Sequence, residues 1–93
     1  MEIATVTFRL HAPWVQSLKE KRMIVKSIIS KIENQFRVSV AEIGGQDIHQ
    51  FIVIGVASIV PNQAYADSMM DEISKYLEEI TDAEILDETR EMR

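Results

Sequence analysis

The sequence predicts a single α+β domain in which four antiparallel strands form one sheet and two helices cover one of its faces. Three observations support this prediction. Apolar residues recur with a period of two in some segments and near 3.6 in others, and the segments follow the order βαββαβ. Both helical segments begin at residues that commonly cap helices. A chain of 93 residues is long enough for one small core.

The first predicted strand, Glu2–His11, alternates between apolar and polar residues. Successive side chains of a strand point to opposite faces, so this pattern indicates one buried face. The residues expected on it are Ala4, Val6, Phe8 and Leu10. Pro13 then ends the strand because it fixes φ and has no backbone donor.

A helix is predicted over residues 17–36. Ser17 can cap its first turn, and Glu20 follows three residues later, as in a Ser-x-x-Glu capping box. At 100° per residue the apolar side chains gather on one face, which indicates packing against a sheet. These residues are Leu18, Val25, Ile28, Ile29, Ile32 and Phe36.

Two strands are predicted next, over residues 37–43 and Phe51–Val60, with a hairpin connection at residues 44–47. The second of these strands is apolar almost throughout, so both of its faces should be covered. Helices would cover one face. A second copy of the chain is expected on the other, which predicts a homodimer or a higher homo-oligomer.

Pro61 ends this strand, and Asn62 can cap a second helix. Its apolar stripe consists of Tyr65, Ala66, Met69, Met70, Ile73, Tyr76, Leu77 and Ile80. The last strand is predicted over residues 83–91, where dense charge suits an exposed edge that resists further pairing. The whole pattern predicts a ferredoxin-like, split βαβ domain over residues 1–93.

Composition excludes several kinds of function. The chain has no cysteine, so disulfides, thiolate metal sites and cysteine nucleophiles are excluded. The N-terminal segment does not resemble an export signal, and no apolar run approaches the ~20 residues that span a bilayer. We therefore expect a cytoplasmic protein with no cofactor and no membrane partner.

No sequence motif for catalysis is present. The chain lacks glycine-rich phosphate loops and the His-Glu-x-x-His motif, and the acidic residues of its last third show no metal-binding spacing. A small enzyme would require His11, His49, Glu42 and Asp47 to meet in one cleft. We predict a binding protein with no catalytic residues.

Charge is distributed unevenly along the chain, whose net charge is −5. Residues 1–40 contain seven Lys/Arg and three Asp/Glu, whereas residues 41–93 contain three and twelve. Cations in the first turn of a helix oppose the helix dipole unless an anion is bound there. The predicted anion-binding or RNA-binding residues at the start of the first helix are Ser17, Lys19, Lys21, Arg22 and Lys26.

Two alternatives accompany this prediction. The basic residues could form only a solvated flank, partly balanced by Glu20 and Glu33. Trp14 could stack on a base or close one end of the core. The sheet itself offers Thr5 and Thr7 where RNA-recognition sheets carry aromatics, so RNA is expected at the helix end and not on the sheet.

Several segments together resemble the YlxP-like family of bacterial domains of unknown function. They are Ser-Leu-Lys-Glu-Lys-Arg at residues 17–22, Val-Lys-Ser-Ile at 25–28, Val-Ser-Val-Ala-Glu at 38–42, and Gln46-Asp47 with Gln50. The resemblance implies a ferredoxin-like fold, a dimer, and genes that often lie near those for translation initiation and ribosome maturation. This chain departs from the family at Ile48 and His49, where a larger aromatic is expected. The resemblance implies no catalytic residue.

Two hypotheses of function follow. The chain is an accessory factor that binds RNA or the ribosome through the basic start of its first helix. Alternatively, it is a protein-interaction or structural homodimer with no nucleic-acid ligand.

Overall fold

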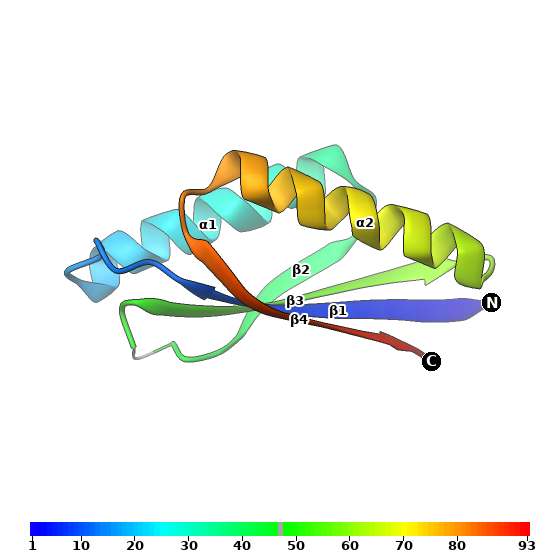
Figure 1. Ribbon diagram of the computed structural model, residues 1–93, viewed down its shortest axis with the longest axis horizontal. Coiled ribbons are helices and arrows are strands. Elements are labelled where there is room, and N and C mark those ends of the chain that lie inside the picture. Colours follow the sequence, from blue (N-terminus) through cyan, green and yellow to red (C-terminus); the bar gives the residue numbers. More distant parts are fainter. Residues whose placement is uncertain (47) are drawn as a thin grey trace.

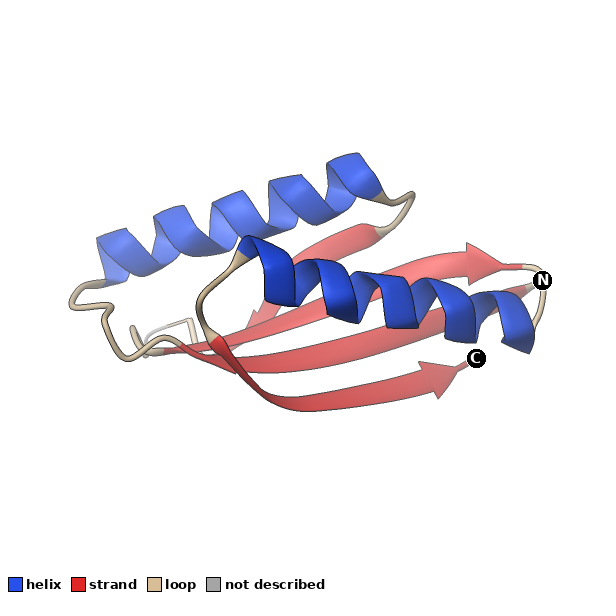
Figure 2. Cartoon of the chain, turned by 45° about the horizontal axis from the view of Figure 1, so that its top comes forward, coloured by secondary structure: helices blue, strands red, loops and turns tan. Residues whose placement is uncertain are grey.

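The computed structural model describes residues 1–46 and 48–93 and confirms the predicted order of elements (Figure 1). The elements are β1 (Glu2–His11), α1 (Leu18–Gln35), β2 (Ser39–Gly44), β3 (Phe51–Val60), α2 (Gln63–Ile80) and β4 (Glu84–Met92). Neighbouring strands are antiparallel, and their order across the sheet is β2-β3-β1-β4. Both helices lie on one side of the sheet (Figure 2), so the predicted ferredoxin-like arrangement is confirmed.

Both helices begin at the predicted caps. The Ser17 hydroxyl accepts a hydrogen bond from the Glu20 amide at 3.1 Å, and the Asn62 side chain accepts one from the Tyr65 amide at 2.9 Å. The capping box is modified, because the Glu20 carboxylate accepts from the Gln16 amide at 3.3 Å and not from the cap residue itself. Each cap satisfies an amide that has no partner inside its helix.

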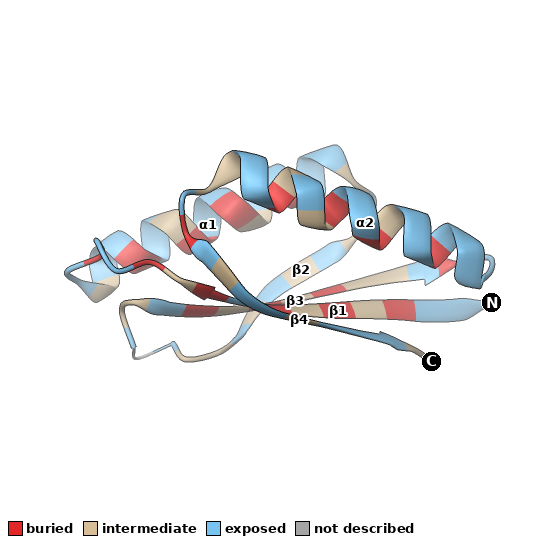
Figure 3. Ribbon diagram, in the orientation of Figure 1, coloured by how far each residue is buried: buried red, intermediate tan, exposed pale blue. Residues whose placement is uncertain are grey.

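The core lies between the helices and the sheet. Figure 3 shows the buried residues on the sides of α1 and α2 that face the strands. All four predicted inward residues of β1 are buried, as are alternate residues of β3, so the two middle strands form the floor of the core. The buried side chains on the helices are Lys21, Val25, Ile28 and Ile32 on α1 and Ala66, Met70, Ile73 and Leu77 on α2.

Some boundaries differ from the predictions. The second strand begins at Ser39 and not at residue 37, and the last strand is shifted by one residue, to Glu84–Met92. Ala83 is excluded from it, because this residue is buried and its amide donates to the Thr81 hydroxyl at 3.1 Å. In the predicted turn, Gly45 has a φ of 65°, a conformation that favours glycine. Asp47 lies outside the described residues.

The opposite face of the sheet is covered by no described element. We call it the uncovered face. Its large apolar side chains remain exposed, namely Ile3, Ile43, Phe51 and Ile59. None of the helices in the described part of the chain is long and apolar enough to cross a membrane.

Candidate functional site

Lys21 is the most deeply buried charged residue of the described chain, with 1% of its surface exposed. Its ammonium donates hydrogen bonds to the carbonyls of Gly45 and Ile48, the latter at 2.8 Å. The Glu42 carboxylate lies 3.0 Å from the same nitrogen. That carboxylate oxygen receives no aligned hydrogen bond, so its contact with Lys21 is mainly electrostatic. Two carbonyl oxygens thus accept hydrogen bonds from the ammonium, and the carboxylate offsets its charge.

The position of Lys21 on α1 explains this burial. It lies four residues before Val25, so it continues the buried stripe by one turn. Glu42 likewise occupies an inward position of β2, two residues after Val40. The helix and the strand thus bring one cation and one carboxylate together inside the domain.

This placement corrects one prediction. Lys21 was expected among the surface residues that contact an anion, but its ammonium is enclosed by Glu42 and by the segment that follows β2. The physical reason is that an enclosed charge must be paired to offset its desolvation. The role that the structure gives Lys21 is to attach that segment to α1.

The other basic residues of this helix end are exposed. Lys19, Arg22 and Lys26 lie on the outer side of α1, within about 60° of one another around the helix axis. None of them forms an ion pair in the part of the chain that the structure describes. We call these three residues the basic strip. Ser17 lies beside it, and its oxygen accepts the cap hydrogen bond.

A second link joins the segments around this helix end. The Gln50 side-chain amide donates to the carbonyls of Pro13 and Val15, at 3.1 and 3.4 Å. The Ala12 amide donates to the Gln50 carbonyl at 2.8 Å. Trp14 stands in the connected loop with 45% of its surface exposed, so it is neither a buried core residue nor a fully solvated one.

The two arginines near the end of the sequence are paired. Arg90 lies 2.9 Å from Asp71 and also contacts Glu88, and Arg93 lies 3.1 Å from Glu91. Partial burial acts to lower the pKa of Arg90, but the hydrogen bonds and negative charges of Glu88 and Asp71 outweigh it and raise that pKa. The excess positive charge of the first 40 residues is therefore presented mainly on α1.

Two of the four residues required for a small enzyme are separated by the sheet. His11 stacks on Phe51 on the uncovered face, whereas Glu42 points to the helix side and pairs with Lys21. These two candidates thus lie on opposite faces of the sheet, and Asp47 lies outside the described residues. Among residues 1–46 and 48–93, no group of three or more histidine or acidic side chains is placed to hold a metal ion.

Sequence reasoning missed the pairing of His11 with Phe51. Their ring centroids are 4.7 Å apart and the ring planes differ by 20°. The two residues are direct cross-strand partners in β1 and β3. The sequence shows only one aromatic residue at the end of each strand. The strand register is needed to show that these two residues are neighbours.

The fold and the charged helix end define a small ferredoxin-like domain with an exposed cationic surface. A profile of the family described as "Protein of unknown function (DUF503)" matches residues 3–90. The "Uncharacterized protein YlxP" of Bacillus subtilis (strain 168) is 31% identical over 68 residues, which cover 73% of this chain and 74% of that protein. The chain belongs to the DUF503 family, and its resemblance to YlxP-like domains is confirmed.

Proposed function

We propose that this protein is an RNA-binding accessory factor whose basic strip contacts phosphates. The observation that carries the proposal is the grouping of three exposed basic side chains on one face of α1. Lys19, Arg22 and Lys26 are exposed without ion pairs in the described chain, although the protein has an excess of carboxylates. Basic side chains grouped on one helix face are a common electrostatic footprint of nucleic-acid binding.

The start of α1 adds to this potential. The first amides of a helix present partial positive charge, and Lys19 stands in that first turn. Glu20 is the only acidic residue there, and its carboxylate accepts from the Gln16 amide. A phosphate beside Lys19 and Arg22 would relieve the unfavourable placement of cations at the positive end of the dipole. The Ser17 hydroxyl can donate its proton to the same anion.

The test is a titration of fluorescently labelled ribosomal RNA fragments with the native protein at 50 and 200 mM salt. Three phosphate contacts on single-stranded RNA predict a slope of about −2 in log affinity against log salt, or roughly 20-fold weaker binding over this range. The variant Lys19→Glu/Arg22→Glu should lose most of the affinity, because each reversal replaces an attraction with a repulsion.

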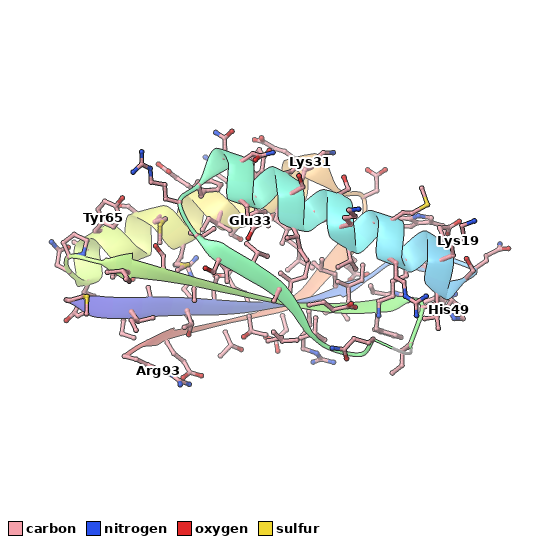
Figure 4. The ribbon with its side chains drawn as sticks, turned by 180° about the vertical axis from the view of Figure 1, so that it is seen from behind. Lys19, Lys31, Glu33, His49, Tyr65 and Arg93 are labelled. Carbon is pink, nitrogen blue, oxygen red and sulfur yellow. The ribbon has the colours of Figure 1, made fainter. Side chains whose placement is uncertain are left out.

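A matched variant controls for net charge. Lys31 lies further along α1, away from Lys19 (Figure 4). Lys75 lies on α2. Lys31→Glu/Lys75→Glu changes the net charge by the same amount and should bind RNA more tightly than the strip variant. Equal loss in both variants would mean that only overall charge matters. Absence of binding by the native protein would reject the proposal.

The second candidate is a homodimer formed through the uncovered face. The observation that favours it is the exposure of large apolar side chains there, including Ile59 at 67%. The strands have 10, 6, 10 and 9 residues. At ~3.3 Å per residue and ~4.8 Å between strands they give a face of roughly 550 Å². This approaches the ~800 Å² that each partner contributes to a stable interface.

Light scattering tests this candidate. A dimer would have twice the 10.7 kDa mass of one chain, and Ile59→Asp should return it to the monomer mass. A native protein that is monomeric at 100 μM would reject the dimer.

A further inference from the structure

The uncovered face carries an aromatic pair at the end of the sheet nearest the start of α1. His11 ends β1 and Phe51 begins β3, and these are the two middle strands. Phe51 keeps 40% of its surface exposed although it is packed against His11. Part of the Phe51 side chain therefore remains accessible to a ligand.

A shallow pocket of about 300 Å³ adjoins this pair. Phe51 and Val53 of β3 line it, together with Gly45 and Ile48 from the segment between β2 and β3. Arg9, which is 56% exposed, is the one charged side chain among the described residues that line it. The site thus combines an aromatic ring, apolar walls and a single guanidinium.

We infer that this pocket holds an unpaired RNA base, which stacks on Phe51 while Arg9 contacts a flanking phosphate. Stacking on aromatic side chains is how proteins hold single-stranded bases, and a guanidinium matches a phosphate in geometry and charge. In RNA-recognition sheets of the same βαββαβ order, the stacking aromatics lie on the two middle strands. The inference rests on the proposed function and revises the expectation that the sheet makes no contact with bases.

Acidic neighbours restrict where the phosphate can lie. Asp87 of β4 is 3.8 Å from Arg9, and Glu84 is the cross-strand partner of His11. Both belong to β4, which contributes no residue to the pocket. The Arg9–Asp87 pair is loose and exposed on both sides, so it is worth little and can exchange for a phosphate. The phosphate then lies on the β3 side of Arg9.

The pocket and the basic strip lie at the same end of the molecule. Figure 4 shows Lys19 and His49 together at this end, whereas Tyr65 and Arg93 lie at the opposite end. His49 belongs to the segment that also supplies Ile48 to the pocket. A single RNA strand that passes around this end would place phosphates on α1 and one base on the uncovered face.

The experiment measures binding of a labelled ten-nucleotide oligoadenylate and of an abasic strand of the same length. Phe51→Leu keeps an apolar side chain but removes the ring, and we expect it to weaken oligoadenylate binding about 5- to 100-fold. Phe51→Tyr keeps the ring and should bind within about twofold of the native protein. The abasic strand should bind all three proteins equally.

Ile59→Leu is the matched control, because Ile59 is on the same strand and face but at its far end. It should leave oligoadenylate binding unchanged. Native-like binding by Phe51→Leu, together with loss in Lys19→Glu/Arg22→Glu, would overturn this inference and leave the proposed function standing. Loss in Phe51→Leu alone would support the base site and reject the basic strip. A stable dimer that buries Phe51, or no binding of either strand, would also overturn the inference.

Discussion

Helix α1 and strand β4 are both rich in charge, but they use it differently. The arginine of β4, Arg90, has carboxylate partners in Asp71 and Glu88, and Arg93 just after the strand has one in Glu91. On α1 Lys21 is buried and paired with Glu42, and the basic strip has no ion pair in the described chain. Charged residues can therefore serve an edge strand, an interior contact or an exposed surface. The position of a charged residue relative to the sheet decides which of these three roles it has.

Removal of the buried Lys21 charge should change the free energy of unfolding more than the other substitutions below. Lys21→Ala leaves Glu42 and two carbonyls without their partner, and we expect a loss of about 3 to 5 kcal/mol in the free energy of unfolding. Urea denaturation followed by circular dichroism measures this change. Lys21→Met/Glu42→Leu removes both charges and should recover part of the loss. A loss below about 1 kcal/mol for Lys21→Ala would contradict the structural role assigned to this residue.

Loss of the cap of α1 should lower the free energy of unfolding by an intermediate amount. Ser17→Ala removes the acceptor for the Glu20 amide, so we expect the free energy of unfolding to fall by about 1 kcal/mol. Ser17→Thr keeps an acceptor and should restore most of that stability. The same urea titration compares the variants. Equal stability of Ser17→Ala and the native protein would show that this cap contributes nothing to the fold.

The smallest differences in stability are expected between substitutions of paired and of unpaired surface cations. Arg90→Gln loses contacts to two carboxylates, and we expect a cost of about 0.5 to 1 kcal/mol. Arg22→Gln breaks no ion pair of the described chain and should change stability by less than about 0.5 kcal/mol. At 1 M NaCl the cost of Arg90→Gln should shrink, because salt screens exposed pairs. A larger cost for Arg22→Gln than for Arg90→Gln would reverse the comparison.

The predictable part of the fold depended on local patterns. Alternation identified β1, and the capping residues Ser17 and Asn62 identified where both helices start. These signals lie within a few residues of one another, so one sequence is sufficient to detect them. Strand ends were less accurate, since charged residues such as Arg37 fit a strand or the loop beside it equally well.

The site was only partly predictable, because its contacts join distant segments. Lys21 could be recognised as inward from its spacing to Val25, but its partner Glu42 lies 21 residues further along the chain. The basic composition of residues 17–22 concealed this difference between neighbouring lysines. The pairing of His11 with Phe51 depends in the same way on strand register, which local patterns do not determine.

The pairing of the first strand with the last one has a consequence for synthesis on the ribosome. β1 is a middle strand, and the Ile3 and Arg93 backbones exchange two hydrogen bonds of 2.8 Å. One edge of β1 can pair with β3 early, but its other edge waits for β4. Until β4 has been made and has paired with β1, the sheet presents an open edge to which another chain can add a strand.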